Sequence, residues 1–600
     1  MRGRTWATHL ASRGSASNRS ITRSADARPK PGTSPLRKER PCLKSIPFRA
    51  AGVVLPLASI RSSRNFGIGQ FSDLGAMARA LGAAGFGWLS LLPINEIQPG
   101  LTSPYSSISS HAFDPIYLDL DEIEEVVALG GERGLERNDR RALEAARRSS
   151  RVDFATVRRL KENLLQRAFI RFELGAGRPG TSGAQALDTF VEEMSPWLLD
   201  DALFHVLRDA NPSLSWRRWP IELRERRPEA LELARRQSAR LCRYYEWLQW
   251  HAIRQLEHAI DEVRRAGMRL AGDLPFALSE ESAEAWEHQG ELNFEANLGT
   301  PPDMFFPLGQ NWGLPAYDWE ALARTGYRWF EARLAWAARF YDLVRLDHAA
   351  GYFRTWLRPK SGAAPHYVPL GEDAQIAQGI EIIDRLRKID VALMAEDLGD
   401  VPIFVRQALW ALGVPGMRVL RWEVDDLSRQ APEDWPDLSI AMTGTHDTPP
   451  LTLWWESLNA AERGKFCALQ ELEKACARSG FDESVWLGLL ETVMGSGSRL
   501  TLLPIEDLFG LRTQINRPGT ISDDNWSFRL PWDADALWQE AAPRRALEAV
   551  SEMLRTSGRI RRESSECSVA LETELRPAAS ERVDSGKDEA AAEIMLGDQE

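Results

Sequence analysis

The segment YDLVRLDH (residues 341–348) joins a short apolar run to the polar side chains of Arg345, Asp347 and His348. Before it, apolar residues recur at intervals of four, three and four, the spacing of one face of a helix: Phe330, Leu334, Ala337 and Tyr341. The segment therefore predicts a helix followed by a buried strand whose carboxyl end carries polar groups.

The same unit occurs again along the chain. VALMAEDLG (391–399) ends in Glu396 and Asp397, and SIAMTGTHD (439–447) ends in His446 and Asp447. Further buried strands are predicted at FGWLSLLPI (86–94), RLAGDLPF (269–276) and GMRVLRW (416–422). Helices alternating with such strands indicate a parallel sheet.

Polar residues at the carboxyl ends of several strands favour an α/β fold of the (β/α)8 TIM-barrel type over residues 49–545. A doubly wound sheet explains the alternation equally well, but it gathers its polar residues at one switch point. At about 120–240 the sequence becomes rich in Arg, Glu and Leu, which predicts a helical insertion subdomain in the barrel.

The two ends differ in composition from the middle. Residues 1–48, rich in Arg, Ser and Pro, predict a disordered N-terminal tail, and residues 562–600 predict a disordered acidic tail after a C-terminal helix at 546–561. The N-terminal tail is interpreted as a dispensable segment, an upstream start or an organelle-targeting peptide.

Charge and cysteine content exclude several classes of protein. Lys and Arg number 74 against 86 Asp and Glu, a net charge of -12 that argues against nucleic acid or membrane partners. Five scattered cysteines with no CxxC spacing predict neither a disulfide framework nor a zinc site. A reducing compartment follows, so the expected localisation is cytoplasmic, with organelle targeting as the alternative.

Three strand-end acids, Asp347, Glu396 and Asp447, lie about 50 residues apart, roughly the length of two βα units. They are expected to converge on one cleft. Paired carboxylates suit glycosyl transfer, in which one attacks the anomeric carbon and another protonates the leaving oxygen. Arg345 shares a strand face with Asp347 and would keep it ionised, although a structural ion pair explains the same spacing.

Motifs for other chemistries are missing. GIGQFS (67–72) lacks the third glycine of a dinucleotide fingerprint, and no P-loop, HExxH or GxSxG motif occurs. Neither a cofactor nor a metal is expected, and a carboxylate metal site at Glu396 and Asp397 stays an open alternative. Tryptophans (22) exceed tyrosines (9), which fits either core packing or platforms for ligand stacking.

From about residue 51 to 530 these segments resemble, in order, the motifs of amylomaltases (4-α-glucanotransferases, or disproportionating enzymes). The most specific is PPDMFFPLGQNWGLPAYDW (301–319). The shorter ones are FGIGQFSDLG, SLLPI, SPYSS, AFDPIYLDL, GDLPFALSEESAEAW, RLDH, AEDLG, GTHD and NRPGT…NWSFR. The resemblance implies a TIM barrel with helical insertions.

The resemblance also implies residue roles. Asp347 matches the nucleophile that forms a covalent glycosyl-enzyme, Glu396 the general acid and base, and Asp447 a third acid that binds sugar hydroxyls. Arg345 would support the nucleophile, and His348 and His446 would flank the reacting sugar. Further residues at cleft-lining positions of the motifs are Tyr105, Asp303, Gln310, Trp312, Tyr317 and Trp319.

Some tryptophans have a second interpretation. Buried packing is the alternative for Trp312 and Trp319, and Trp286, Trp454 and Trp455 are expected in the core.

The implied function is transfer of α-1,4-glucan segments between maltooligosaccharides, or starch or glycogen chains, by a retaining double displacement. The implied partners are glucan donors and acceptors, glucose included. The alternatives are an α-glucan hydrolase of the same barrel type and a catalytically silent glucan-binding protein.

Three departures from the family pattern bear on acceptor preference and on the ratio of transfer to hydrolysis. Ala349 and Ala350 replace an aromatic residue and an arginine after His348. Thr448–Pro449–Pro450 follows Asp447 where the family has Asn-Asp-Thr, and the acids at two positions are lengthened to Glu281 and Glu284.

Overall fold

The computed structural model describes residues 49–302, 307–423, 431–467, 469, 480–520 and 522–560. The tails expected at 1–48 and 562–600 lie outside these residues. None of the described helices is both long and apolar enough to cross a membrane.

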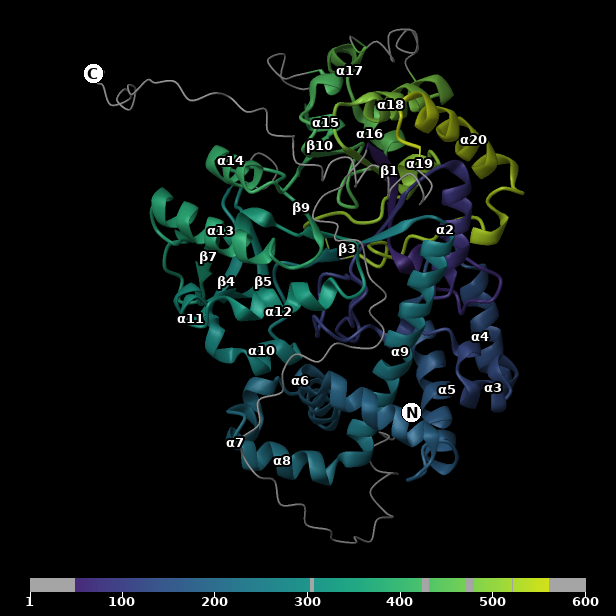
Figure 1. Cartoon of the computed structure of the whole chain (residues 1–600), viewed down its shortest axis with the longest axis vertical. Helices are drawn as coiled ribbons and strands as arrows, with labels where there is room; N and C mark the ends of the chain where they lie inside the picture. Colours follow the sequence, from purple (N-terminus) through teal and green to yellow (C-terminus); the bar gives the residue numbers. More distant parts are fainter. Residues whose placement is uncertain are drawn as a thin grey trace, which may run out of the picture. The chain divides into compact units, whose positions relative to one another are not determined.

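Eight parallel strands form the central sheet, and neighbours in the sheet follow one another along the chain (Figure 1). The strands are β1 (Ala50–Leu55), β2 (Trp88–Leu91), β3 (Arg269–Leu274), β6 (Leu343–Leu346), β9 (Ala392–Ala395), β10 (Gly416–Val419), β11 (Ser439–Met442) and β12 (Leu500–Pro504).

The sheet closes on itself. The first strand, β1, pairs in parallel with the last, β12, with Ala50 opposite Leu500. Between β9 and β10 the N–H of Ala395 donates to the carbonyl of Pro415 at 2.9 Å. A doubly wound sheet has open edges, so this closure confirms the expected (β/α)8 barrel.

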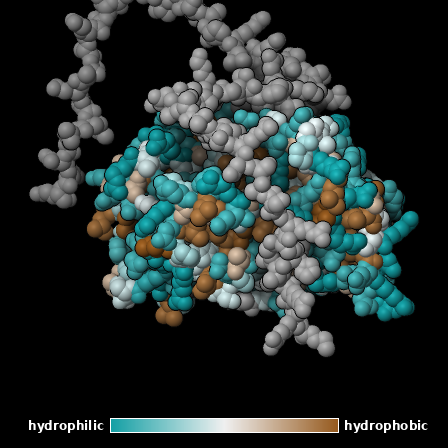
Figure 2. All heavy atoms as spheres, turned by 90° about the horizontal axis from the view of Figure 1, so that it is seen from below, coloured by the Kyte–Doolittle hydropathy of each residue, from teal (hydrophilic) through white to brown (hydrophobic). Residues whose placement is uncertain are grey.

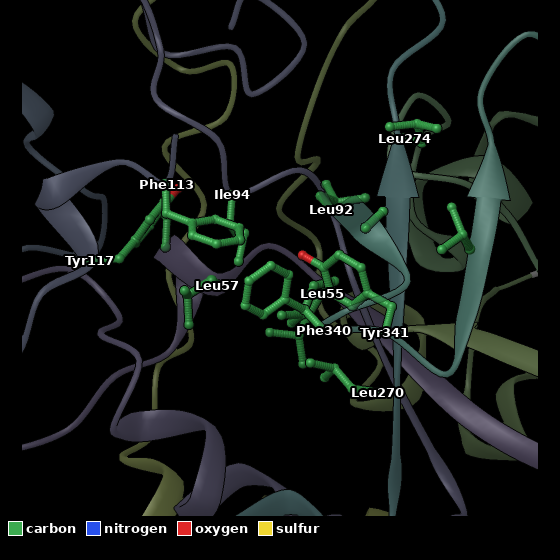
Figure 3. Packing of buried hydrophobic residues seen from close by; sticks show 14 of the residues in the cluster. Leu55, Leu57, Leu92, Ile94, Phe113, Tyr117, Leu270, Leu274, Phe340 and Tyr341 are labelled. Carbon is green, nitrogen blue, oxygen red and sulfur yellow. The ribbon is translucent and has the colours of Figure 1, made fainter. Parts of the chain in front are cut away.

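Alternate residues of each strand face two different cores. One set fills the barrel interior and includes Leu343 of β6, Met394 of β9 and Ile440 of β11. The other set packs outward beneath the helices. Figure 3 shows part of this outer layer, where Leu55 of β1 and Leu270 of β3 lie near Phe340 and Tyr341. Burial on both faces explains why the strands are nearly continuous apolar runs.

Helices surround the barrel (Figure 1). They are α2 (Asp73–Ala84), α9 (Ala239–Arg265), α10 (Ala283–Glu287), α11 (Trp319–Arg324), α12 (Arg328–Ala337), α13 (Glu372–Leu386), α14 (Ile403–Ala411), α15 (Leu420–Glu423), α16 (Leu451–Ser457), α17 (Ala460–Phe466), α18 (Glu483–Gly495), α19 (Ile505–Leu508) and α20 (Ala541–Thr556). The last, α20, begins and ends earlier than the 546–561 helix expected from the sequence.

Single turns of 3-10 helix occur between these elements. They are η1 (Leu57–Ser59), η2 (Pro115–Tyr117), η3 (Leu120–Glu122), η4 (Gly131–Gly134), η5 (Trp216–Arg218), η6 (Gln289–Glu291), η7 (Ala349–Tyr352), η8 (Pro432–Asp434) and η9 (Ala534–Ala536).

The segment at about 120–240 is mainly helical. It contains α3 (Glu124–Ala128), α4 (Arg137–Arg148), α5 (Phe154–Leu174), α6 (Ser182–Ala210), α7 (Ile221–Arg224) and α8 (Pro228–Gln237). Two cations of α5, the partly buried Arg158 and the buried Lys161, tie it to the segment after β2. Arg158 binds both oxygens of Asp114, and the Lys161 ammonium donates to the carbonyls of Ile116 and Leu118 at 2.6 Å each.

The molecular face in Figure 2 is mostly hydrophilic, with hydrophobic residues in scattered groups.

A second, antiparallel sheet was not expected from the sequence. Its strands are β4 (Leu292–Thr300), β5 (Gln310–Tyr317), β7 (Thr355–Pro359) and β8 (His366–Val368), in the order β5-β4-β7-β8. The segments that follow β3 and β6 contribute these strands. The sheet therefore stands beside the carboxyl ends of two neighbouring barrel strands.

Two cysteines are among the described residues. Cys242 is a buried free thiol, whereas Cys467 is disulfide-bonded. The sequence predicted no disulfide framework; the single bonded cysteine Cys467 was not anticipated but does not make such a framework.

A close contact between α13 and the turn after β6 gives a stability prediction. A methyl group added at Gly379 of α13 would lie 1.9 Å from the ring of Phe353. Gly379→Ala is therefore expected to lower the free energy of unfolding by about 1–3 kcal/mol, because the ring is buried and must shift.

The matched control is Gly464→Ala in α17, where an added methyl meets no atom within 4 Å. Its expected effect is a gain of up to about 1 kcal/mol from helix propensity. Urea denaturation of both variants measures the difference. Equal stabilities for the two variants would contradict the packing of Phe353 on Gly379.

Candidate active site

Strand register brings polar side chains together at one end of the barrel. Asp273 of β3 pairs with Arg345 of β6, which in turn pairs with Met394 of β9. Side chains two residues apart share a face, so Asp347 and Glu396 extend the same inward-facing rows past the strand ends. The acids at the ends of β6 and β9 are therefore neighbours.

The guanidinium of Arg345 holds these acids. Its Nη1 donates to both oxygens of Asp273, at 2.8 and 2.7 Å, and to Oδ1 of Asp347 at 2.8 Å. Its Nη2 lies 3.8 Å from Oε2 of Glu396. Burial alone lowers the pKa of Arg345, but the carboxylates around it raise that pKa well above its usual value. Arg345 is therefore a permanent cation.

Both oxygens of Asp347 have donors. Oδ1 accepts from Arg345, and Oδ2 accepts from the N–H of Phe276 at 3.3 Å. The side chain of Asp347 is 22% exposed, so one side of it remains accessible. These donors stabilise the negative charge that a nucleophilic carboxylate needs.

Glu396 has the properties of a proton donor. Burial raises its pKa to about 7, the charge of Asp347 adds to the shift, and Arg345 opposes it. Its Oε2 accepts the N–H of His348 at 2.7 Å. His348 has a left-handed backbone, with φ 42° and ψ 55°, a conformation that is uncommon in residues other than glycine and often marks a functional site.

Tyr105 links the ion cluster to the end of β11. Its hydroxyl donates to Oδ2 of Asp273 at 2.7 Å, and its ring stacks on His446 with centroids 5.3 Å apart. Trp526 packs against both rings. Burial, followed by the charge of Asp273, raises the pKa of Tyr105, which therefore stays a neutral donor.

Asp447, the third expected acid, stands next to His446. Its side chain is 45% exposed, and its Oδ1 accepts a hydrogen bond from the amide of Asn516 at 2.6 Å. The N–H of Asn516 also donates to the carbonyl of His446. The chain through His446 and Tyr105 therefore connects Asp447 with the Arg345 cluster.

Among its described residues, the segment 301–319 contributes the aromatic side chain of Trp312 to the site. Trp312 of β5 meets the ring of His348 edge-on, with centroids 5.0 Å apart. Its Nε1 donates to Oε1 of Gln310 at 3.0 Å. Both side chains are partly exposed. Asp303 lies outside the described residues.

Tyr317 and Trp319 are placed differently from the other expected cleft residues. Tyr317 is 3% and Trp319 5% exposed, and both pack against Phe276 and Phe330. Trp319 also donates to Oγ1 of Thr355 at 2.9 Å. For Trp319 the structure thus favours the alternative of buried packing.

The three tryptophans expected in the core differ in how far they are buried. Trp286 and Trp455 are completely buried, which confirms the expectation for these two, whereas Trp454 is partly exposed.

Arg333 of α12 is a supporting residue that the sequence did not indicate. It is 1% exposed, and its guanidinium donates to the carbonyls of Pro275 at 2.6 Å and Phe276 at 3.3 Å. The hydroxyl of Tyr317 donates to the same Phe276 carbonyl at 2.5 Å. These bonds fix the two peptides on either side of Phe276, and the first of them, Pro275–Phe276, supplies the N–H that binds Asp347. No motif in the sequence marks Arg333, so only its tertiary contacts reveal this role.

Two of the departures from the family pattern have clear structural roles. The Oε1 of Glu284 accepts from the Ser110 hydroxyl at 2.7 Å and lies 3.2 Å from Nδ1 of His111. It thereby holds the loop that carries Tyr105.

Pro449 supplies a carbonyl that accepts from the buried Arg421 at 2.7 Å. Ala349 and Ala350 are buried in η7, directly beside His348.

A metal site at Glu396 and Asp397 was the open alternative, and the described residues around them form no cluster of metal ligands. Asp397 accepts the N–H of Met417 at 2.7 Å and lies 3.5 Å from Nε of Arg406. Within the described part of the chain, no three His, Cys, Asp or Glu residues form a group that could hold a metal ion.

The arrangement of Arg345, Asp347 and Glu396 suits chemistry with two carboxyl groups, one ionised and one able to carry a proton.

The comparisons with known proteins agree with this geometry. A family model described as 4-alpha-glucanotransferase matches residues 55–534. The chain belongs to this family.

Curated 4-alpha-glucanotransferases support the assignment. That of Chlamydia muridarum is 30% identical over 512 residues, which cover 83% of this chain and 94% of the relative. That of Thermus thermophilus is 30% identical over 499 residues, with 80% and 95% coverage. The expected enzyme class, 4-α-glucanotransferase, is confirmed.

A solved structure supports the fold. An amylomaltase from Streptococcus agalactiae in complex with acarbose matches with a TM-score of 0.73 and 23% identity. The match covers 85% of this chain and 99% of that one.

Arg333 gives a testable prediction for the site. Arg333→Met removes the donors to Pro275 and Phe276, so the Phe276 N–H should no longer be aimed at Asp347. We expect kcat to fall about tenfold at nearly constant KM, because the loss concerns orientation of the attacking group.

Arg333→Lys retains one donor and should recover part of the rate. Thermal unfolding of both variants separates this effect from a loss of folded enzyme. Turnover of Arg333→Met within twofold of wild type, per folded molecule, would show that Arg333 does not position the nucleophile.

Proposed function

We propose that this glucanotransferase works by a retaining double displacement with Asp347 as the nucleophile and Glu396 as the general acid and base. Donors and acceptors are α-1,4-linked maltooligosaccharides, or starch or glycogen chains, and glucose also serves as an acceptor. The proposal rests on two linked observations: Arg345 binds Asp347 directly, and the neighbouring Glu396 has a pKa of about 7.

In the first step Asp347 attacks the anomeric carbon of the donor while Glu396 protonates the departing glycosidic oxygen. Arg345 and the Phe276 N–H keep the carboxylate of Asp347 ionised and oriented. A pKa of about 7 leaves a large share of Glu396 protonated at neutral pH, and this share is the competent form for donor cleavage.

In the second step Glu396 acts as a base. Once Asp347 is esterified it has lost its negative charge, and that charge is one of the causes that raise the pKa of Glu396. The pKa of Glu396 therefore falls in the intermediate, and the proton released to the leaving group is not regained at once. The ionised Glu396 can then take a proton from the 4-hydroxyl of an acceptor.

The other expected residues bind the sugars. Asp447 accepts hydrogen bonds from sugar hydroxyls, and its Asn516 contact fixes it for this role. His348 and His446 flank the reacting glucose, and Trp312 offers an apolar face beside His348. Gln310 orients Trp312. Tyr105 contributes through Asp273, and Tyr317 through the Phe276 peptide.

Two alternatives are distinguished by products. An α-glucan hydrolase uses the same carboxylates but passes the glycosyl group to water. A silent binding protein would need a defective centre, whereas here Arg345, Asp347 and Glu396 are all present and connected. Incubation with maltotriose tests all three: longer oligomers plus glucose indicate transfer, maltose plus glucose alone indicate hydrolysis, and binding without turnover indicates a silent protein.

Asp347→Asn is expected to abolish both transfer and hydrolysis, a fall of at least about 10³-fold, because an amide cannot form the glycosyl ester. The substitution is nearly isosteric, so the thermal unfolding curve should remain cooperative. Product analysis by chromatography after incubation with maltotriose provides the measurement. Turnover like that of the wild type would refute the nucleophile assignment.

The raised pKa of Glu396 predicts the alkaline limb of the pH profile of kcat/KM. Because the acid must be protonated for donor cleavage, kcat/KM should fall as pH rises through about 7, with a slope approaching tenfold per pH unit. Glu396→Gln should lose this limb and nearly all activity on maltotriose.

A maltosyl fluoride donor is the internal control, because fluoride departs without protonation. With this donor the first step of Glu396→Gln should proceed close to the wild-type rate. An equal loss on both donors would assign Glu396 a role other than proton transfer to the leaving group.

A further inference from the structure

The loop that carries His446 and Asp447 is held at both ends by two buried charged side chains. It runs from residue 443 to residue 450, between β11 and α16. Arg421 comes from α15, after β10, and Asp507 comes from α19, after β12. The side chain of Arg421 is 3% exposed and that of Asp507 is 1% exposed. The reaction proposed above uses neither of them.

Each of the two charged side chains bonds to both ends of the loop. At the first end, the hydroxyl of Thr443 donates to Oδ2 of Asp507 at 2.6 Å, and its carbonyl accepts from Nε of Arg421 at 3.0 Å. At the second end, the carbonyl of Pro449 accepts from Nη1 of Arg421 at 2.7 Å. The N–H of Leu451 donates to Oδ1 of Asp507 at 2.7 Å. The entry and the exit of the loop are therefore fixed relative to each other.

Arg421 and Asp507 also stabilise each other. Nη2 of Arg421 lies 4.0 Å from Oδ2 of Asp507. Burial lowers the pKa of Arg421 to about 10 and the charge of Asp507 opposes the shift, so the guanidinium is a cation at neutral pH. Gly444 leaves room for it, because a methyl group at this position would lie 2.5 Å from Nη2. The loop is thus wrapped closely around a buried ion pair.

The residues of the loop transmit this restraint to Asp447. Thr448–Pro449–Pro450 is a segment in which this chain departs from the family pattern, and it contains two residues that precede a proline. Proline has a fixed φ, and a residue before a proline is confined to extended conformations, so this segment is stiff. The Thr448 hydroxyl donates to the carbonyl of Thr445 at 2.9 Å and accepts the N–H of Thr445 at 3.0 Å. These bonds close the turn in which Asp447 lies.

We propose that Arg421 and Asp507 are positioning residues for Asp447, which they hold in place through both ends of its loop. The inference rests on the proposed function, in which Asp447 binds sugar hydroxyls. On its other side Asp447 accepts the amide of Asn516 at 2.6 Å. A carboxylate that is already fixed needs no reorganisation when charge develops on the sugar in the transition state.

The test is a double-mutant cycle between Arg421 and Asp447, with maltosyl fluoride as a reactive donor. Arg421→Met alone should lower kcat about tenfold and change KM by no more than about threefold, because the loss concerns orientation in the transition state. In an Asp447→Asn background the same substitution should cost less than about twofold, since the group that it positions is already lost. Equal losses in the two backgrounds would overturn the proposal.

Two milder variants accompany Arg421→Met, because that substitution leaves Asp507 buried without its cation. Thr443→Val preserves the shape of the side chain and removes one hydrogen bond to Asp507, so kcat should fall about tenfold. Arg421→Lys keeps the charge and one donor and should recover part of the rate. A kcat of Thr443→Val equal to that of the wild type, per folded molecule, would contradict the role of Asp507.

The matched control is Arg559→Met, which removes another buried arginine that binds carbonyls. Arg559 donates to the carbonyls of Met494, Ser496 and Ser498 at 2.6 to 2.8 Å, just before β12 and therefore at the end of the barrel opposite the active site. Its loss should lower the unfolding temperature but leave kcat per folded molecule within about twofold of wild type. A loss equal to that of Arg421→Met would assign the effect of Arg421 to general stability.

Hydrogen exchange separates this proposal from the reaction itself. Peptides that span 443–451 should exchange at least about tenfold faster in Arg421→Met than in the wild type, whereas those that span 341–348 should be unchanged. Unchanged exchange over 443–451 would refute the hold of Arg421 on the loop even where kinetics are altered. By contrast, a kcat of Asp447→Asn equal to that of the wild type would refute the proposed role of Asp447 and not the restraint on its loop.

Discussion

The buried guanidinium of Arg345 is the constraint on which the active site depends. Three carboxyl groups, Asp273, Asp347 and Glu396, lie within 4 Å of it. Three negative charges in a poorly hydrated cleft would repel one another strongly, and the cost of burying each is several kcal/mol. One cation with several donors offsets that cost and fixes the acids in unequal environments. Arg345 donates two hydrogen bonds to Asp273 and one to Asp347, whereas its distance to the Glu396 carboxylate is 3.8 Å.

The barrel is what allows one arginine to serve three acids. Parallel register places Asp273 beside Arg345, and closure of the sheet keeps the neighbouring strand ends on a common rim. A slip of one residue in β6 would turn Arg345 and Asp347 outward toward the helices and bring Val344 and Leu346 inward. The apolar cores on both faces of β6 oppose such a slip, so packing far from the substrate determines where the charges lie.

This dependence explains what the sequence could predict. Asp347 and Glu396 follow apolar runs directly, so local pattern was enough to place them at strand ends and to favour a barrel. The antiparallel sheet was missed because β4 and β7, which pair in it, are separated by more than fifty residues of other structure. Tyr317 and Trp319 belong to a specific motif, but their burial depends on Phe276 and Phe330 from other segments. The role of Arg333 likewise exists only in the contacts it makes with the Pro275–Phe276 peptide.

In the mechanism proposed above, the unequal sharing of Arg345 among the acids also connects the two chemical steps. While Asp347 is ionised, its charge helps to keep the proton on Glu396, and Arg345 is divided among three acids. When Asp347 becomes an ester, the repulsion disappears and the cation has one fewer anion to neutralise. Its field then favours ionisation of Glu396 at the moment when a base is required. In this proposal the switch of Glu396 from acid to base needs no movement of the protein, because formation of the covalent bond itself changes the electrostatics. Rigid support of the Phe276 peptide by Arg333 and Tyr317 is compatible with this cycle, since the same geometry serves both steps.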